Sequence, residues 1–322
     1  MDTKRDILAI DDLSPDELRD IIKWAISAKQ DEGLFEEFMP LQGMTIGSIY
    51  EKPSTRTRVS FEVGIDKLGG NPLTLLKGDI QLGKSESIED TAAVLSRYLG
   101  AITYRCFGHA DVESLANGAT VPVINALSDL HHPCQAAADM MTILENYEHY
   151  SELKVAWVGD GNNVLHDLML ATAALGMKMH YAVPKGFEPN EEVVKRATIL
   201  AKNSGGEIKS THDPIEAVKD ANVIYTDVFI SMGEEHTSGE LINKMSAFDY
   251  FQVNEELVSH ADDDYIFMHC LPAHRGEEVT DGVIDSSNSV VFDQAENRMW
   301  AQMSLMTFLI HPAAWEAFAD LH

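Results

Sequence analysis

Residues 54–58 read Ser-Thr-Arg-Thr-Arg and combine three hydroxyl groups with two guanidinium groups in one short segment. The segment lies between an apolar run at 45–50 and an apolar pattern of helical spacing that starts at Val59. The first backbone N–H groups of a helix lack internal partners, and the helix dipole adds positive potential there. Guanidinium groups form forked hydrogen bonds with phosphate oxygens. The segment therefore predicts a site for a phosphorylated ligand, the alternative being a capped helix with two surface arginines.

A second polar stretch, Leu130-His131-His132-Pro133-Cys134-Gln135, follows a strand-like run and precedes a helical pattern. Ligands of open α/β sheets bind at the carboxyl ends of the strands, so His132 and Gln135 are candidates to hold a carbonyl or an amide group. The His-His-x-Cys spacing also resembles part of a metal site, although no second His/Cys pair at ligand spacing accompanies it. A buried, internally satisfied histidine is the remaining alternative.

Residues 158–163, Val-Gly-Asp-Gly-Asn-Asn, lie between a strand-like run and a helical pattern. The third glycine of a dinucleotide-binding turn is missing, because Val164 stands at its place. This departure disfavours a dinucleotide ligand. The turn instead offers Asn162 or Asn163 to a ligand at the edge of the sheet.

Candidate chemistry also follows two later strand-like runs. Asp227 and the loop residues Ser231-Met232-Gly233 suit an amino-acid ligand, because a carboxylate pairs with an ammonium group. An aspartate that only forms a turn is the alternative. In His269-Cys270-Leu271-Pro272, a thiol beside a histidine indicates either a nucleophile or a compact pocket wall. Arg298 opens the last helical pattern, from which it could reach a reacting centre.

Composition excludes several classes of partner. The 52 acidic residues outnumber the 24 basic ones and give a formal net charge of -28, whereas nucleic acids and anionic membranes require positive surface. Three cysteines make no disulfide framework, and no run approaches the roughly 18 apolar residues of a membrane span. The first residues lack the apolar stretch of a signal peptide, so we expect a cytoplasmic protein. A salt-rich cytoplasm would suit the acidity, which also serves ordinary solubility.

The candidate residues need a scaffold in which strands and helices alternate. Strand-like runs cover 45–50, 72–76, 101–104, 122–125, 154–158, 178–182, 207–210, 223–226, 265–270 and 289–292. Helical patterns separate them, and the first opens with the capping box Ser14-Pro15-Asp16-Glu17. The alternation predicts an α/β fold with two doubly wound parallel-sheet domains. We expect domains at 1–145 and 146–299, with a C-terminal helix at 300–322 that packs back on the first.

Taken together, the motifs resemble the aspartate/ornithine carbamoyltransferase family, in the same order and over nearly the whole chain. Ser-Thr-Arg-Thr-Arg matches its carbamoyl-phosphate signature, and 132–135 match its His-Pro-x-Gln motif. Asp227 with Ser-Met-Gly, and His-Cys-Leu-Pro at 269–272, resemble the ornithine branch and separate it from the aspartate branch. The resemblance implies an active site in the cleft between a carbamoyl-phosphate-binding domain and an ornithine-binding domain.

The resemblance also implies roles for individual residues. Carbamoyl phosphate would contact Ser54, Thr55, Arg56, Thr57, Gln81, Arg105, His132, Gln135, Cys270, Leu271 and Arg298. Ornithine would contact Asn163, Asp227, Ser231 and Met232. The implied catalytic groups are Arg105, His132, Asp227, Cys270 and Arg298. Gln81 matches a residue supplied to the neighbouring subunit's site, which implies a homotrimer or an assembly of trimers. Arg58, by contrast, is expected to brace its helix or the interdomain region.

The implied reaction moves the carbamoyl group of carbamoyl phosphate to the δ-amino group of L-ornithine, giving L-citrulline and phosphate without a metal, a cofactor or a covalent intermediate. The same groups serve arginine biosynthesis and, in reverse, arginine breakdown. The nearest alternative is a carbamoyltransferase for putrescine or an acylated ornithine. Aspartate is disfavoured as the acceptor, because the negative charge of Asp227 cannot pair with the side-chain carboxylate of an aspartate substrate. A non-catalytic binding protein and a nucleotide-dependent oxidoreductase are more distant alternatives.

Overall fold

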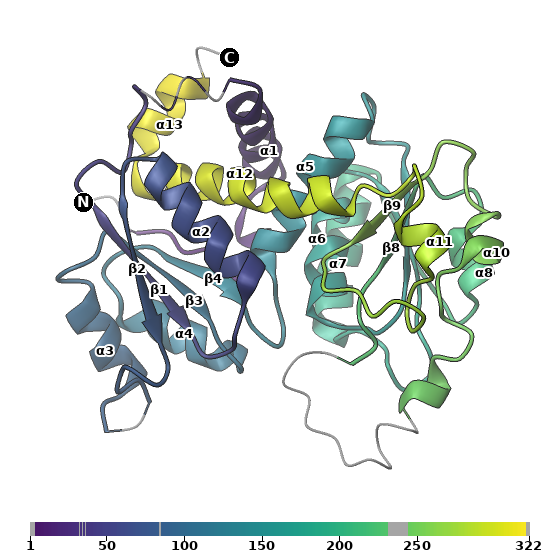
Figure 1. Cartoon of the computed structure of the whole chain (residues 1–322), viewed down its shortest axis with the longest axis horizontal. Coiled ribbons are helices and arrows are strands. Elements are labelled where there is room, and N and C mark those ends of the chain that lie inside the picture. Colours follow the sequence, from purple (N-terminus) through teal and green to yellow (C-terminus); the bar gives the residue numbers. More distant parts are fainter. Residues whose placement is uncertain are drawn as a thin grey trace. The chain divides into compact units, whose positions relative to one another are not determined.

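The computed structural model describes residues 4–31, 33, 35, 37–83, 85–230 and 244–319. The chain divides into two compact units (Figure 1). The first unit comprises Met1–Met141 with Glu296–His322, and the second comprises Thr142–Ala295. Within the described ranges, no helix is long and apolar enough to cross a membrane.

The first unit contains a four-stranded parallel sheet in the order β2-β1-β3-β4. Its strands are β1 (Thr45–Tyr50), β2 (Asn71–Leu76), β3 (Ala101–Arg105) and β4 (Val123–Leu127). Because β1 lies between β2 and β3, the chain adds β2 on one side of β1 and then adds β3 on the other side. Such a reversal of strand order leaves a crevice at the carboxyl ends of the two neighbouring strands, where ligands bind. The segments after β1 and β3 are thus placed for a site.

Helices cover both faces of this sheet (Figure 1). They are η1 (Ile10–Asp12), α1 (Pro15–Gln30), α2 (Thr55–Lys67), α3 (Ile88–Leu95), α4 (His109–Gly118), α5 (Pro133–Asn146), α12 (Val291–Ile310) and α13 (Pro312–Ala319). α3 and α4 pack Ala92, Val112 and Leu115 into a core with residues of the sheet. On the other face α2 meets α12 closely, because a Cβ at Gly64 would lie 3.1 Å from the Met303 side chain. α5 and α12 each cross the boundary between the units.

The second unit contains a five-stranded parallel sheet in the order β7-β6-β5-β8-β9. Its strands are β5 (Lys154–Val158), β6 (Lys178–Ala182), β7 (Glu207–Thr211), β8 (Val223–Thr226) and β9 (Ile266–His269). Its helices are α6 (Asn163–Ala174), α7 (Glu191–Ser204), α8 (Pro214–Val218), α10 (Glu255–Val258) and α11 (Asp281–Ile284). Strand order reverses between β5 and β8, and ligands of such sheets bind at the carboxyl ends of the two strands where the order reverses.

The two doubly wound parallel sheets confirm the predicted fold class. The expected strand at 289–292 is wrong, because only a single bridge joins Ser289 to Phe267 before α12 begins at Val291. The final helical pattern is also divided, with α12 ending at Ile310 and α13 starting at Pro312. Proline lacks the N–H that a continuing helix would use, and it is favoured in a first turn.

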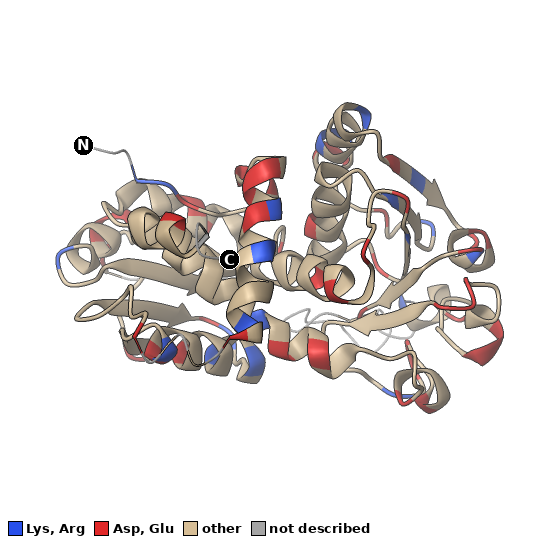
Figure 2. Cartoon of the chain, turned by 90° about the horizontal axis from the view of Figure 1, so that it is seen from above, with Lys and Arg blue, Asp and Glu red and all other residues tan. Residues whose placement is uncertain are grey.

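Charge is distributed differently on the surface and in the interior. Asp and Glu residues occur along the elements of both units rather than in one tail (Figure 2). Two arginines of the first unit, Arg105 and Arg298, are nevertheless buried. Burying a charge is costly unless it is paired, so these two arginines are candidates for a functional role.

Candidate active site

Helix α2 begins directly after the connection that follows β1. Ser54 is its N-cap, with an extended backbone and a hydroxyl that accepts a hydrogen bond of 3.3 Å from the Thr57 amide. The amides of Thr55 and Arg56 come before the first hydrogen bond within the helix. No acidic residue lies in this first turn to offset the helix dipole. The helix start therefore has the geometry and the potential of a candidate anion site.

Two buried arginines converge on the hydroxyl of Thr57. Arg105 Nη1 donates to Thr57 Oγ1 at 3.4 Å, and Arg298 Nη2 donates to the same oxygen at 3.1 Å. Their exposed fractions are only 4% for Arg105 and 3% for Arg298. Arg105 ends β3, beside β1, whereas Arg298 comes from α12. Guanidinium donors that converge in this way can hold an anion or a polarised carbonyl oxygen.

Gln135 is oriented by partners on both sides of its amide. Its Oε1 accepts a hydrogen bond of 2.6 Å from Arg298 Nη1, and its Nε2 donates to Asp139 Oδ1 at 2.9 Å. Asp139 is fully buried and lies one turn further along α5. Sequence reasoning missed Asp139, for which the only available signal was its i,i+4 spacing from Gln135 on an expected helix.

His132 is buried in the same cluster and is held neutral. Burial, the Arg298 guanidinium and the Arg105 guanidinium, in that order of importance, lower the pKa of His132 well below its ordinary value. A neutral imidazole still carries one N–H, so His132 can donate a hydrogen bond to an oxygen without adding charge. His131, in contrast, belongs to the local turn, where its amide donates to Ser128 Oγ at 3.1 Å.

The two arginines of the opening motif differ in their surroundings. Arg58 is exposed, and its Nε donates to Glu62 Oε1 at 2.9 Å along the surface of α2. Arg56 is half-buried, and its side chain is not engaged in this pair. Gln81 lies exposed in the connection between β2 and α3, and its side chain makes no hydrogen bond with the described residues.

In the second unit Asp227 is a buried carboxylate at the carboxyl end of β8. Its exposed fraction is 6%. Asn162 Nδ2 donates to Asp227 Oδ2 at 2.8 Å, and Cys270 Sγ donates to Asp227 Oδ1 at 2.9 Å. Asn162 follows β5 and Cys270 follows β9, so three strand ends meet at one carboxylate. Both of these donors are neutral, so Asp227 is a candidate to pair with a cationic group of a ligand.

Asn162 joins this carboxylate to the start of α6. Its Oδ1 accepts from the amides of Val164 at 3.0 Å and Leu165 at 3.2 Å, which makes it the N-cap of the helix. Asn163, the predicted ligand, is the first residue of α6 and is partly exposed. The sequence left the choice between the two asparagines open, and the structure shows that Asn162 contacts Asp227.

The turn that carries Asn162 is also held from its other side. Lys244 Nζ lies 3.0 Å from Asp160 Oδ2, and Trp157 Nε1 donates to the Asp160 carbonyl oxygen at 3.0 Å. A Cβ at Gly161 would clash with the Phe187 carbonyl oxygen, so this glycine permits a close approach of two backbone segments. This close packing explains the glycine at position 161, so a nucleotide ligand is not needed to explain it. Sequence reasoning missed Lys244, which is far from Asp160 along the chain.

His269 is fully occupied by partners other than Cys270. Its Nδ1 accepts from the Leu271 amide at 2.9 Å, and its Nε2 donates to the fully buried Glu278 Oε1 at 3.1 Å. The same Glu278 oxygen accepts from the His274 amide at 2.6 Å. These bonds hold Leu271 in a left-handed backbone conformation, with φ of 57°. Since no ring nitrogen is left to take the thiol proton, the arrangement favours Cys270 as a pocket wall over a nucleophile.

Asp227, His269 and Cys270 are also close enough together to be considered as metal ligands. Both ring nitrogens of His269 already carry the hydrogen bonds described above. A metal would have to displace one of them, so the residues do not fit a preformed metal centre. The predicted ornithine contacts Ser231 and Met232 lie outside the described residues.

Comparison with known proteins decides the family. Residues 5–145 match the model of the aspartate/ornithine carbamoyltransferase carbamoyl-P binding domain, and residues 151–309 match that of the Asp/Orn binding domain. The chain belongs to the aspartate/ornithine carbamoyltransferase family. The members of this family are carbamoyltransferases, and the chain is therefore a carbamoyltransferase. The arginine cluster lies in the first matched region, and Asp227 lies in the second.

Individual carbamoyltransferases are similar over almost their whole length. A protein of Thermococcus kodakarensis named ornithine carbamoyltransferase is 54% identical over 306 residues, covering 95% of this chain and 96% of its own. One of Thermoplasma acidophilum, named as the catabolic enzyme, is 52% identical and covers 96% of this chain and 99% of its own. The solved ornithine carbamoyltransferase of Pyrococcus furiosus is 52% identical, with a TM-score of 0.91 over 96% of this chain and 97% of that chain.

His132 should make the stability of this carbamoyltransferase depend on pH. An unfolded histidine takes up a proton near pH 6.5, whereas folded His132 stays neutral to lower pH. The unfolded state therefore binds more protons below pH 6.5, and stability is lost as the pH falls. We expect the free energy of unfolding of the parent protein to fall below pH 6.5 by up to about 1.4 kcal/mol per pH unit more than that of His132→Gln. Urea unfolding of both proteins between pH 7.5 and 5.5 measures the difference, and parallel pH profiles would contradict the assignment.

Proposed function

We propose that this protein is an ornithine carbamoyltransferase, which transfers the carbamoyl group of carbamoyl phosphate to the δ-amino group of L-ornithine and releases L-citrulline and phosphate. The observation that carries the choice of acceptor is the buried Asp227 carboxylate, whose hydrogen-bond donors Asn162 and Cys270 are both neutral. A free negative charge suits the ammonium of ornithine and repels the side chain of aspartate. The names of the similar carbamoyltransferases support the same acceptor.

Residues 1–145 would bind carbamoyl phosphate. The phosphate would lie on the start of α2, against Ser54, Thr55, Arg56 and Thr57, where helix amides and a half-buried guanidinium supply positive potential. The carbamoyl end would lie toward the buried cluster of Arg105, His132 and Gln135, joined by Arg298 of α12. This division is supported by the chemistry of the cluster, whose donors suit a carbonyl oxygen next to a phosphate.

Residues 146–299 would bind ornithine. Asp227 would pair with its ammonium group, and Asn163, Ser231 and Met232 would contact the rest of the molecule. Asn162 acts as a positioning residue, because it fixes one oxygen of Asp227 while capping α6. Glu278 has the same role for Leu271, which it holds through His269.

The reacting amine must lose its proton before it attacks. An amine of the lysine type has a pKa near 10.4, so most of it is protonated at neutral pH. Asp227 and Cys270 are placed to orient this amine, with the thiol already donating to the carboxylate at 2.9 Å. The neutral amine then attacks the carbonyl carbon directly. No covalent enzyme intermediate is needed, because the amine itself is the nucleophile.

Attack places negative charge on the carbonyl oxygen. Thr57, Arg105 and neutral His132 provide pre-positioned donors for this oxyanion, and buried donors of this kind stabilise developing charge without reorganisation. The C–O bond to phosphate then breaks, and Arg56 and the start of α2 stabilise the leaving phosphate. The phosphate can accept the proton that the amine gives up.

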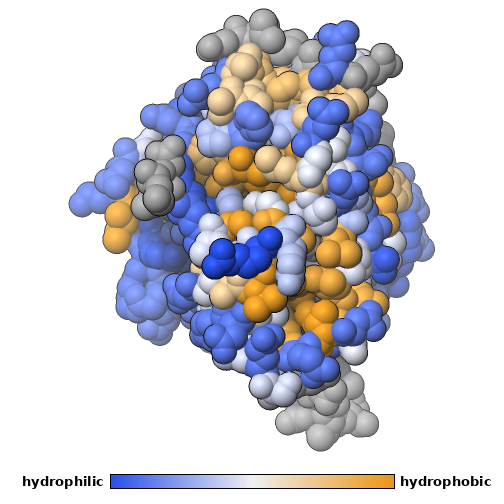
Figure 3. All heavy atoms as spheres, turned by 90° about the vertical axis from the view of Figure 1, so that its left-hand side faces the viewer, coloured by the Kyte–Doolittle hydropathy of each residue, from blue (hydrophilic) through white to orange (hydrophobic). Residues whose placement is uncertain are grey.

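We further propose a homotrimer in which Gln81 completes the site of a neighbouring subunit. β2 is an edge strand of the first sheet, and Leu73 and Leu76 on it are exposed. Val59 and Val63 on α2 are exposed as well. Figure 3 shows apolar side chains among polar ones on one face of the first unit. An uncovered edge strand with apolar neighbours supports subunit contacts here.

A substrate panel tests the proposed reaction. Carbamoyl phosphate is mixed with L-ornithine, putrescine, an acylated ornithine or L-aspartate, and the carbamoylated product is measured by mass spectrometry. We expect turnover with ornithine and little or none with the other three, because only ornithine combines the cationic amine with a free α-amino acid group. A higher kcat/KM for putrescine or the acylated amine would assign the site to that acceptor instead.

Arg56 and Arg58 provide a matched test of the phosphate site. Arg56→Ala should lower kcat/KM for carbamoyl phosphate at least about 100-fold, since charge-assisted bonds to phosphate are strong and strengthen as phosphate leaves. Arg58→Ala should retain activity within a few-fold, because Arg58 pairs with Glu62 on its own helix. Steady-state kinetics measure kcat/KM for carbamoyl phosphate in both variants. An equal loss in the two would overturn the assignment of Arg56 as a phosphate ligand.

Asn162→Asp tests how Asp227 is positioned. The substitution keeps a capping oxygen for α6 but replaces the donor to Asp227 by a second carboxylate. We expect kcat/KM for ornithine to fall about 10- to 100-fold, with KM for carbamoyl phosphate unchanged. Asn190→Asp is the control, because Asn190 caps α7 in the same way and does not contact Asp227. Similar kinetics in the two variants would remove Asn162 from the site.

Mixed oligomers test whether Gln81 acts across subunits. Arg56→Ala and Gln81→Ala should each be nearly inactive alone. Refolded together, they should regain activity, because a subunit with an intact Arg56 can receive an intact Gln81 from a neighbour. Native mass spectrometry verifies that hybrids have formed. Hybrid trimers without recovered activity would show that Gln81 serves its own subunit or none.

A further inference from the structure

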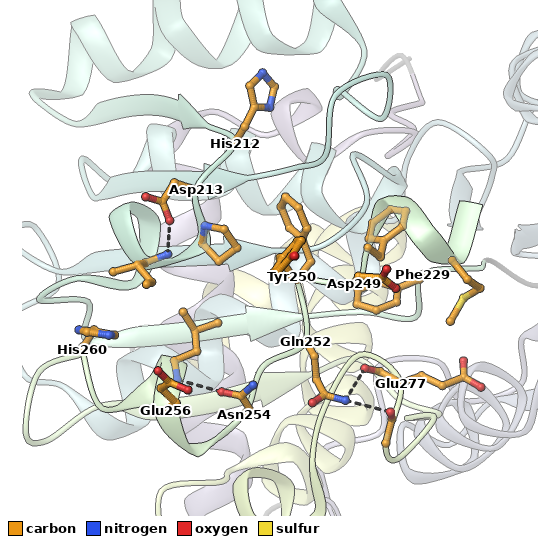
Figure 4. Close-up of a pocket in the computed structure, with 17 residues that line it drawn as sticks. His212, Asp213, Phe229, Asp249, Tyr250, Gln252, Asn254, Glu256, His260 and Glu277 are labelled. Atoms are coloured by element: carbon orange, nitrogen blue, oxygen red, sulfur yellow. Dashed lines mark hydrogen bonds between the residues drawn. The ribbon is translucent and has the colours of Figure 1, made fainter. Parts of the chain in front are cut away.

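The second unit contains a cavity outside the proposed carbamoyl-transfer site (Figure 4). Its volume is about 690 Å³, which lies within the range of sites for small molecules. The residues that line it come from the segments 212–215, 229, 245–257, 260 and 276–277. None of them has a role in the reaction proposed above, so the cavity needs its own explanation.

Aromatic side chains form the floor of the cavity. The Phe229 and Phe248 rings are stacked with centroids 4.5 Å apart, and the Phe251 ring lies 6.0 Å from that of Phe248. Tyr250 is 89% exposed, and Figure 4 shows it at the centre of the lining residues. The three phenylalanines are buried, so the exposed Tyr250 ring is the main aromatic surface for a ligand with an apolar body.

The rim of the cavity is acidic. Its charged residues are Asp213, Asp249, Glu256 and Glu277, and no lysine or arginine lines it within the described part of the chain. Asp213 caps α8 through the Ile215 amide at 3.0 Å, and Glu277 lies 3.5 Å from His274. The carboxylates of Asp249 and Glu256 make no hydrogen bond or ion pair with any described residue. They are available to a ligand, and Figure 4 shows them on opposite sides of Tyr250.

We propose that this cavity binds a small organic cation, a primary amine carried on an apolar or aromatic body. Ammonium groups pair with carboxylates, and they are attracted to aromatic faces such as that of Tyr250. The four carboxylates would repel an anion, and a neutral apolar molecule would gain only the contacts of the floor. Binding here is independent of carbamoyl transfer, so the proposal stands or fails separately from the proposed function.

Fluorine NMR of three matched probes tests the ligand class. The probes are 4-fluorophenethylamine, 2-(4-fluorophenyl)ethanol and 3-(4-fluorophenyl)propionate, which share a ring and differ in charge. Saturating ornithine and phosphate occupy the proposed substrate sites in every measurement. We expect the amine to bind at least about tenfold more tightly than the other two, and to weaken as salt screens the carboxylates. Equal affinities for the three probes would overturn the proposal.

Substitutions locate the binding. Asp249→Asn with Glu256→Gln should weaken binding of the amine about tenfold while leaving the two other probes unchanged. Glu191→Gln with Glu192→Gln on α7 removes the same charge from an exposed helix start and should have no effect. Carbamoyl-transfer kinetics of both pairs should match the parent. Unchanged amine binding in the Asp249/Glu256 pair, or equal loss in the α7 pair, would refute a site in this cavity.

Discussion

The burial of Arg105 and Arg298 around Thr57 is the constraint on which the first unit depends. Two guanidinium groups are removed from water, and the partners identified for them are a hydroxyl and an amide, which accept hydrogen bonds without cancelling charge. The resulting potential helps to keep His132 neutral. The end of β3, the start of α2 and helix α12 must meet to bring these groups together, and the proposed carbamoyl phosphate site depends on that meeting.

The second unit has the opposite polarity and the same topological basis. Asp227 is a buried negative charge whose donors, Asn162 and Cys270, are neutral. In each sheet the strand order reverses at the site, between β1 and β3 in one and between β5 and β8 in the other. Residues at the carboxyl ends of neighbouring parallel strands are brought together by the sheet itself, so few long-range interactions are needed to assemble each cluster.

Motifs contiguous in the chain were the most predictable part of the site. A Ser or Thr cap at the helix start in 54–58 and the capping box at Ser14 follow from local hydrogen bonding, and the structure confirms both. The supporting residues Asp139, Glu278 and Lys244 were missed. Lys244 acts through a contact whose partner is identified only after folding, because Asp160 is 84 positions away. The expected strand at 289–292 failed for a related reason, since strand formation depends on a neighbour and not on β-propensity alone.

The amino-acid sequence alone determined the alternation of strands and helices, the capped start of α2 and the family resemblance, because these depend on short-range patterns of side chains. Only the tertiary structure decided which side chains share a hydrogen bond. It brought Asn162 rather than Asn163 to Asp227, engaged both nitrogens of His269 away from Cys270, and separated the exposed Arg58 from the buried arginines. Hydrogen bonds and burial act over a few ångströms in space, and only packing fixes those distances.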